Sequence, residues 1–267
     1  MSQVQIRLER ITMRFRRRGQ EPFTALQDVS FEVEAGRFVS VVGPSGCGRS
    51  TTLSIIAGLL TPTSGEVWLD GQPVSGVQTN VGFMFQRDAL FPWKTVLDNV
   101  MAGLIFRKVP RQKARDKALE WIRRVGLSGF EHHYPYQLSG GMRKRVSLAQ
   151  TLVYGPQTLL MDEPFSALDV QTRDLMENEL LALWQELRKT VLFITHDLEE
   201  AIALSDEVIV MTAAPGRVKA RYAIDLPRPR NVLDIRTDLH FMQLYEQIWA
   251  DLRDEVMASH SGIRSTS

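Results

Sequence analysis

The sequence feature that most constrains the fold is a glycine-rich turn, GPSGCGRST, at residues 43–51. It directly follows the apolar run FVSVV at 38–42 and precedes a run typical of a helix, STTLSIIAGLL. A strand, a glycine-rich turn and a helix in this order form a phosphate-binding loop, in which converging backbone N–H groups and the helix dipole bind an anion. The pattern predicts an α/β chain that binds a nucleotide, and it disfavours a glycine-rich turn without a ligand.

The residues of this turn have separate predicted tasks. The glycines leave space for the backbone to curl around phosphates, and Ser50 would present its hydroxyl to Mg²⁺ with Thr51 beside it. We predict that the following residues bind the nucleotide: Gly43, Pro44, Ser45, Gly46, Cys47, Gly48, Arg49, Ser50 and Thr51.

Arg49 occupies the position where the pattern G-x-x-x-x-G-K-[ST] has lysine. Arginine keeps the positive charge, but its guanidinium is planar and bulkier than an ammonium. A small displacement of the γ-phosphate can lower the rate of a reaction strongly. We hypothesise that ATP binding is retained and that hydrolysis is slower than with lysine; the alternative, that local adjustment makes the two residues equivalent, stays open.

The run TLLMDEP at 158–164 reads as an apolar strand that ends in two carboxylates. If this strand lies beside the glycine-rich turn, Asp162 can hold Mg²⁺ directly or through water, and Glu163 can orient or deprotonate the attacking water. Two acidic residues at a strand end are also common as solvated charge. The phosphate loop earlier in the chain favours the functional interpretation.

A second anion site is predicted where LSGGMRKR, at 138–145, enters a helical run. Ser139, Gly140 and Gly141 would leave backbone N–H groups exposed at the start of that helix. A helix cap alone would explain Ser139, but it would not explain two successive glycines.

The rest of the chain alternates between strand and helix patterns, which predicts a mostly parallel sheet with crossover helices. A hairpin is expected at 65–74, and helical periodicity with clustered basic residues dominates from about 87 to 155. A surface helix is predicted from an apolar stripe formed by Phe241, Tyr245, Ile248, Leu252 and Val256, followed by a tail at 259–267.

The bulk properties exclude several classes of protein. The net charge of the 267 residues is +1, so nothing indicates global attraction to nucleic acid. For the basic run at 111–124, a solvated helix face is favoured over a nucleic-acid or lipid surface. No apolar run approaches the roughly 18–20 residues that cross a bilayer. We therefore expect a soluble chain that docks on a membrane partner.

Four motifs, GPSGCGRST, LSGGMRKR, LLMDEPFSALD and FITHD, occur in this order, and together they resemble the nucleotide-binding subunit of ATP-binding cassette (ABC) transporters over roughly residues 4–225. The resemblance implies an α/β fold with a RecA-like P-loop core, an antiparallel β subdomain and an inserted helical subdomain, the ABC ATPase fold. We expect the ATPase domain at 1–230, its helical subdomain at about 87–155, and a helical extension with a tail at 231–267.

The resemblance also implies roles for residues that the pattern alone leaves open. Phe15 lies where the family stacks an aromatic ring on adenine, although it is also suited to a strand core. Gln86 resembles the glutamine that contacts Mg²⁺ and the attacking water, and His196 resembles the histidine that contacts the γ-phosphate. The expected catalytic residues are Glu163, His196 and Gln86, and the expected metal-binding residues are Ser50, Gln86 and Asp162.

Two further departures from the family pattern accompany Arg49. Lys144 replaces the glutamine that is frequent after LSGGMR, and Gln150 stands where arginine is frequent. The core sequence SGG is intact, so we expect the second anion site to bind in trans, to the ATP of another copy.

The family resemblance predicts the cofactors ATP and Mg²⁺ and several partners. A second copy would sandwich ATP between its own LSGG and the phosphate loop of this chain, and the residues 166–169 would cross that interface. The loop RDALFPW, at 87–93, would touch a membrane permease at the cytoplasmic face of the inner membrane. A periplasmic or lipoprotein solute-binding protein would act indirectly, and no nucleic acid is expected.

Within the family, the runs DALFPWKTVLDNV and DLPRPR resemble importers of nitrate, sulfonate and taurine. Two alternatives remain at this stage. One is an ABC ATPase without a transport role, and the other is an ATP-binding subunit with weak hydrolysis because of Arg49.

Overall fold

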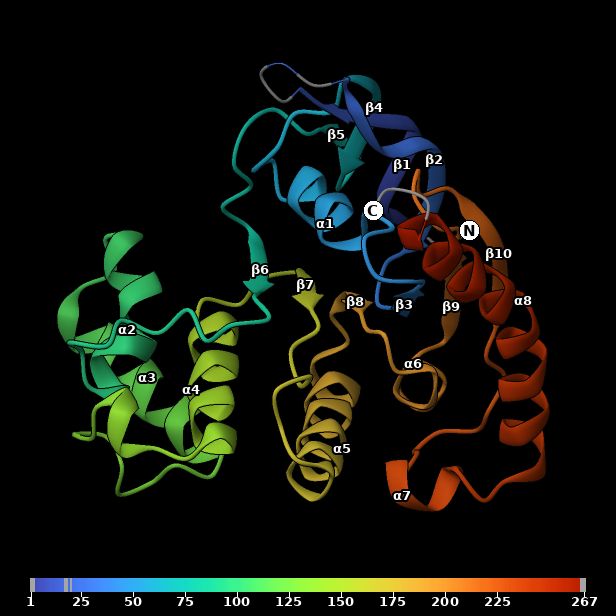
Figure 1. The fold of residues 1–267 in the computed structure, drawn as a ribbon. Coiled ribbons are helices and arrows are strands. Elements are labelled where there is room, and N and C mark those ends of the chain that lie inside the picture. The colour runs from blue at the N-terminus through green and yellow to red at the C-terminus, as the bar shows by residue number, and fades with distance from the viewer. Residues whose placement is uncertain (1–2, 17–18, 20, 265–267) are drawn as a thin grey trace.

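A parallel sheet forms the centre of the computed structural model, which describes residues 3–16, 19 and 21–264 (Figure 1). Its strand order is β10-β9-β3-β8-β7-β6, and all neighbours are parallel except β10, which pairs antiparallel with β9. The strands are β3 (Phe38–Val42), β6 (Val81–Met84), β7 (Thr158–Asp162), β8 (Thr190–Ile194), β9 (Glu207–Met211) and β10 (Val218–Ala223).

The inner strands of this sheet are apolar because both of their faces are covered. Every residue of β3 and β8 is buried, as expected for a parallel sheet between helical layers. In the register of the sheet, Val41 pairs with Ile194, and Ile194 pairs with Asp162. The carboxyl ends of β3, β8 and β7 therefore meet at one edge, so the segments that follow them begin side by side.

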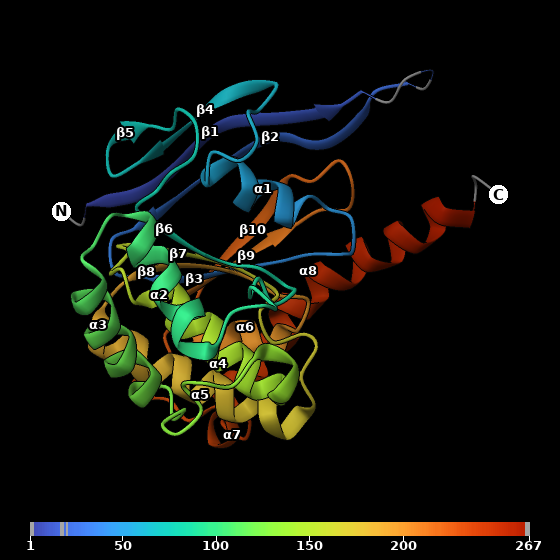
Figure 2. The same ribbon diagram turned by 90° about the vertical axis from the view of Figure 1, so that its left-hand side faces the viewer.

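A second, antiparallel sheet has the order β2-β1-β4-β5. Its strands are β1 (Val4–Phe15), β2 (Phe23–Glu34), β4 (Ser64–Leu69) and β5 (Gln72–Pro73). The pairing of β4 with β5 confirms the hairpin that the sequence predicts. Helix α1 (Arg49–Ile56) lies between the two sheets, where Leu53 and Ile56 are fully buried in the shared core (Figures 1 and 2).

Further helices cover the other face of the parallel sheet and one side of the molecule. Helices α2 (Val96–Phe106), α3 (Arg111–Arg124) and α4 (Gly140–Leu152) lie together, with a 3₁₀ turn at Pro135–Gln137 before α4. Helices α5 (Val170–Leu187) and α6 (Leu198–Leu204) lie under the sheet, on the opposite side from α1 (Figure 1). The basic helix at 111–124 buries Ala114, Ala118 and Trp121 and exposes most of its charges to solvent.

The chain ends in α7 (Val232–Ile235) and α8 (Leu239–Arg264), which lie on the far side from α2–α4 (Figure 1). Phe241, Ile248 and Leu252 are buried, as the predicted stripe requires, while Tyr245 and Val256 are half-buried. The helix continues to Arg264 where the sequence predicts a tail from 259, and residues 265–267 lie outside the described part of the chain.

The segment between β10 and α7 is held by two arginines rather than acting as a plain linker. Arg230, which is 7% exposed, donates hydrogen bonds to backbone carbonyls at the end of α6 and after β10. Arg228 pairs with Asp206 at 2.8 Å and lies over the ring of Trp184. These contacts satisfy carbonyls that a helix end leaves without a partner.

Among the described helices, none has the length and apolar character needed to cross a bilayer.

Candidate functional site

The glycine-rich turn joins β3 to α1 at the carboxyl edge of the parallel sheet. Gly48, directly before α1, has φ +94°, and an added Cβ atom would lie 2.4 Å from Leu26 Cδ2. A side chain there would be strained and would clash, so the tight approach of turn and β2 requires glycine. Ser45, Gly46 and Ser50 are exposed, which leaves the start of α1 open to an anion.

Ser50 and Asp162 meet across this edge as the sequence predicts. Ser50 Oγ donates a hydrogen bond to Asp162 Oδ1 at 2.9 Å. Burial raises the pKa of Asp162, and the adjacent Glu163 charge raises it further, while the Ser50 hydrogen bond and Arg49 oppose this. A carboxylate held in this way is stabilised by a nearby cation.

The oxygen atoms of Ser50 and Asp162 suit Mg²⁺, which prefers hard oxygen ligands and completes its shell with water and phosphate. The described residues contain no group of three or more His, Cys, Asp or Glu side chains that could hold a metal by themselves. A magnesium ion at this edge would therefore depend on the nucleotide phosphates for part of its coordination.

Glu163 lies at the centre of a cluster of three donors. Arg49 Nη2 is 3.0 Å from its Oε1, Gln86 Nε2 is 3.3 Å from its Oε2, and His196 Nδ1 is 2.9 Å from the same oxygen. Glu163 has φ +42°, and its amide donates to Ile194 O at 2.9 Å. A non-glycine residue in this region is strained, and the bond to β8 holds its carboxylate toward the cluster.

Arg49 is 8% exposed and is held at both ends of its guanidinium. Nη1 donates to the backbone carbonyl of Gly43, and Nη2 forms the ion pair with Glu163. The arginine thus links the beginning of the turn to the carboxylate after β7. The sequence places this charge in the loop, but it does not indicate the pairing with Glu163.

An open hollow of about 770 Å³ adjoins this cluster. It brings together three predicted residues from separate motifs, Gln86, Glu163 and His196. Its remaining lining residues are Arg87, Asp88, Lys144, Ser166 and Ala167. Most residues that line the hollow are polar or charged, which suits a charged ligand.

Ser139, Gly140 and Gly141 do not line this hollow. Ser139 caps α4, because its Oγ accepts from Met142 N at 3.2 Å. Gly141 is buried, and an added Cβ would lie 2.7 Å from Thr172 Cγ2 in α5, so the packing of the two helices explains that glycine. An added Cβ at Gly140 would lie no closer than 3.6 Å to a neighbouring atom, so packing does not require glycine there. The predicted anion site at the helix start remains the proposed reason for this glycine.

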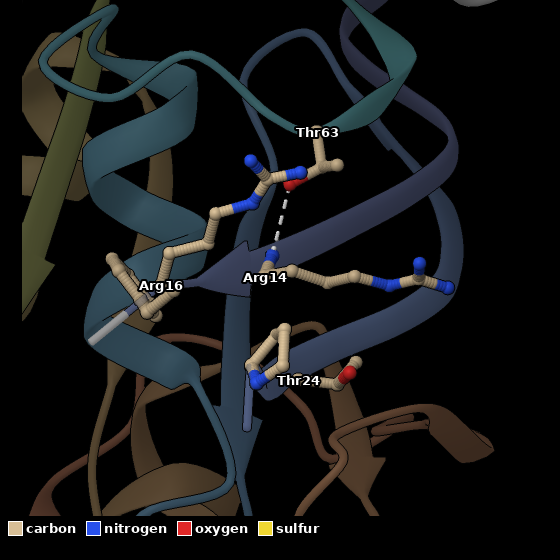
Figure 3. Close-up of a pocket in the computed structure, with 6 residues that line it drawn as sticks. Arg14, Arg16, Thr24 and Thr63 are labelled. Atoms are coloured by element: carbon tan, nitrogen blue, oxygen red, sulfur yellow. Dashed lines mark hydrogen bonds between the residues drawn. The ribbon is translucent and has the colours of Figure 1, made fainter. Parts of the chain in front are cut away.

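Phe15 ends β1 and lines a different hollow of about 630 Å³. Figure 3 shows this hollow with Arg14, Arg16, Thr24 and Thr63 labelled among the residues that line it. The amide of Arg14 donates to Thr63 Oγ1 at 2.9 Å. Phe15 is half-buried and packs against the core cluster that contains Cys47 of the glycine-rich turn. Its ring thus combines partial core packing with an open side, and both predicted interpretations fit this position.

Sequence reasoning missed the importance of Lys144 and did not identify Asp88. Lys144 Nζ donates to the backbone carbonyl of Gln86 at 2.8 Å and pairs with Asp88 Oδ1 at 2.9 Å. The only signal in the sequence is that Lys144 departs from the family pattern. Gln86 lies 58 residues earlier in the chain, so no local spacing shows the contact.

Comparison with known proteins identifies the family. The model of the ABC transporter family matches residues 26–166. An uncharacterized ABC transporter ATP-binding protein of Methanocaldococcus jannaschii is 48% identical over 96% of this chain and 94% of its own length. The taurine import ATP-binding protein TauB of Yersinia pestis is 47% identical over 75% of this chain and 79% of its own length. TauB of Rhizobium johnstonii is 45% identical over 85% of this chain and 88% of its own length.

Solved structures agree with this assignment and confirm the expected fold. A dimeric bacterial ABC transporter cassette superposes with a TM-score of 0.74 at 34% identity, over 83% of this chain and 100% of the cassette. The same cassette in a post-hydrolysis state with ADP and Pi gives the same values. This chain therefore belongs to the ABC transporter family, as one of its ATP-binding and ATP-hydrolysing cassettes.

Proposed function

We propose that this chain is the ATPase subunit of an importer for a small solute such as taurine, another sulfonate or nitrate. The proposal is supported by two relatives named for taurine import, at 47% and 45% identity. The observation that carries the ATPase part of the proposal is the convergence of Ser50, Asp162 and Glu163 at the carboxyl edge of the parallel sheet, next to the start of α1. A triphosphate with its metal would bind at this edge.

In this proposal the nucleotide binds along α1. Backbone N–H groups of residues 43–51 hold the phosphates, the Arg49 guanidinium neutralises their charge, and the ring of Phe15 stacks on the adenine. Ser50, Asp162 and Gln86 would hold Mg²⁺ through their side-chain oxygens. When bound, the ion neutralises phosphate charge and orients the triphosphate.

Hydrolysis would use the cluster around Glu163. The Glu163 carboxylate either accepts a proton from the attacking water or orients that water. Gln86 holds the same water by its side-chain amide. His196, 2.9 Å from Glu163 in this structure, would contact the γ-phosphate and so couple the phosphate to the position of the base. Each role requires the cluster to open enough to admit water between its members.

A second copy would complete the site. The start of α4, with Ser139, Gly140 and Gly141, lies outside the hollow beside Glu163 and is suited to the ATP of another chain. The structural relative at 34% identity is described as a dimer. ATP would hold two copies together, and its hydrolysis would release them, so that the two states alternate.

The membrane partner would bind at the loop after Gln86. Trp93 is 71% exposed and Phe106 is 71% exposed, and the rings of both lie near Phe91. Exposed aromatic side chains grouped in this way mark an interaction surface. We place the permease there, at the cytoplasmic face of the inner membrane, with a solute-binding protein acting on the opposite face.

The dimer can be tested with the Glu163→Gln variant, which keeps the shape of the side chain but cannot act as a base. Light scattering should show a dimer for this variant in the presence of Mg·ATP. With Mg·ADP, both this variant and the wild type should be mostly monomeric. Monomer alone under all conditions contradicts the sandwich model.

Import can be tested by making the same substitution in the source organism. Uptake of at least one labelled solute among taurine, an alkanesulfonate and nitrate should be lost, while uptake of an unrelated amino acid continues. Unchanged uptake of all three would overturn the import proposal, even if the purified chain hydrolyses ATP.

A second function is favoured by one observation, the ion pair of Arg49 with Glu163 at 3.0 Å. It occupies the proposed base, so the chain would bind ATP and hydrolyse it poorly. Negligible turnover together with tight ATP binding, in the presence of its permease, would support this alternative.

A further inference from the structure

A buried ammonium connects α4 to the segment that carries Gln86. Lys144 is 2% exposed, and its Nζ lies 2.8 Å from Gln86 O and 2.9 Å from Asp88 Oδ1. A buried charge is tolerated when it is paired and hydrogen-bonded, and it is costly when one partner is removed. Lys144 therefore keeps residues 86 and 88 beside α4.

Arg143 of α4 also reaches this segment, with its Nε 3.1 Å from Asp88 Oδ2, whereas Lys144 reaches both Asp88 and the main chain of Gln86. Phe85, Gln86 and Arg87 are exposed and follow the end of β6. The Gln86 side chain donates to Glu163 Oε2 at 3.3 Å, a long bond on an exposed side chain. The position of this side chain consequently depends on where the Gln86 main chain is anchored.

We infer that Lys144 is a positioning residue for ATP hydrolysis, which holds the main chain of Gln86 so that its side-chain amide reaches the water beside Glu163. The inference rests on the proposed roles of Gln86 and Glu163. Lys144 lies one turn into the helix that begins with the Ser139 cap, so the same contact ties the start of α4 to Gln86.

The neighbouring Arg145 provides a matched comparison. It is also a cation of α4, and it pairs with Glu179 of α5 and donates to Val125 O at 2.9 Å. These contacts stabilise helix packing but do not touch the Gln86 segment. A substitution at Arg145 thus tests the loss of a partly buried cation without the loss of the Gln86 anchor.

The first test measures ATP turnover by purified single variants at Lys144, which are then combined with Gln86→Ala in a double-mutant cycle. Lys144→Met should lower kcat about ten-fold with KM for ATP changed less than about two-fold, because the anchor acts on the reaction rather than on binding. Lys144→Gln should lie between the wild type and Lys144→Met, since an amide can reach the carbonyl of Gln86 but cannot pair with Asp88 as an ion.

The double variant with Gln86→Ala distinguishes positioning from a general structural role. If Lys144 acts through Gln86, Lys144→Met should add less than about two-fold to the effect of Gln86→Ala. Arg145→Met should combine multiplicatively with Gln86→Ala. A multiplicative effect of Lys144→Met, or a kcat within two-fold of the wild type, would overturn the inference.

Hydrogen exchange provides a readout that does not depend on turnover. The amides of residues 85–90 should exchange at least about five-fold faster in Lys144→Met than in the wild type, and Arg145→Met should leave them unchanged. Equal exchange in the three proteins contradicts the anchoring role. A wild-type chain that hydrolyses no ATP would instead contradict the proposed function, and the exchange result would still decide the role of Lys144.

Discussion

Arg49 Nη2 lies 3.0 Å from Glu163 Oε1, so the charge of the phosphate loop pairs with the carboxylate proposed as the base. Arg49 is 8% exposed and also donates to the carbonyl of Gly43. A guanidinium has several donors in one plane and can hold both partners at once. In the proposed mechanism, binding of ATP would draw this charge toward the phosphates and free Glu163 to contact water.

Arg49→Lys is expected to raise ATP turnover about three- to ten-fold, because a compact ammonium can leave Glu163 for the phosphates without rearranging a planar group. Steady-state kinetics would measure this change, and calorimetry should show a Kd for Mg·ATP within about three-fold of the wild type. A lysine variant that is no faster would mean that local adjustment makes arginine equivalent.

Ser50→Ala is expected to increase the Mg²⁺ concentration for half-maximal turnover about ten-fold or more, because the variant lacks the hydroxyl proposed as a metal ligand. That hydroxyl is hydrogen-bonded to Asp162, another proposed ligand at this edge. Turnover would be measured against MgCl₂ at constant ATP. Ser54→Ala is the control, since Ser54 lies one turn further along α1 and donates to Ser50 O. An equal Mg²⁺ requirement in both variants contradicts the metal role of Ser50.

Arg230→Leu is expected to lower the free energy of unfolding by about 2–4 kcal/mol, because buried carbonyls would lose their donor. The affected acceptors are the backbone oxygens of Ile202, Ala203, Ser205, Ile224 and Leu226. Urea unfolding would measure the change, with Arg253→Leu as an exposed control. A loss below about 0.5 kcal/mol would show that these bonds contribute little.

Two buried carboxyls should make stability fall as pH rises. Burial raises the pKa of Glu177 to about 9, and the charge of Glu200 raises it while Arg236 lowers it. Burial also raises the pKa of Glu200 to about 7, opposed by the Thr195 hydrogen bond. Above the ordinary value of 4.5 the unfolded chain releases protons that the folded chain keeps, so the free energy of unfolding decreases between about pH 4.5 and 9.

Glu177→Gln should remove part of this decrease. The free energy of unfolding of the variant minus that of the wild type should increase by about 1–3 kcal/mol from pH 6 to pH 8.5. Urea unfolding at each pH would measure this difference. Glu246→Gln, at an exposed position of α8, should show no such change. A difference between Glu177→Gln and wild type that is the same at both pH values would show that Glu177 ionises normally in the folded chain.

The sequence alone predicted the features that local patterns encode. The glycines at 43, 46 and 48 and the apolar runs at 38–42 and 158–162 indicated a phosphate loop and a parallel sheet. Backbone conformation and burial limit which residues can stand at such positions, so these features are visible in a single sequence. The family resemblance then added Gln86 and His196, whose types would not have been distinctive by themselves.

The tertiary structure decided which side chains meet. The register of β3, β8 and β7 brings Arg49, Glu163 and His196 together, although they come from three separate segments. Lys144 reaches the Gln86 segment from α4, and Arg230 holds the segment between β10 and α7 through buried hydrogen bonds. The sequence determined the backbone path through local sterics and hydrophobic periodicity, whereas these pairings depend on how the elements pack, because hydrogen bonds and ion pairs act over a few ångströms between residues far apart in the chain.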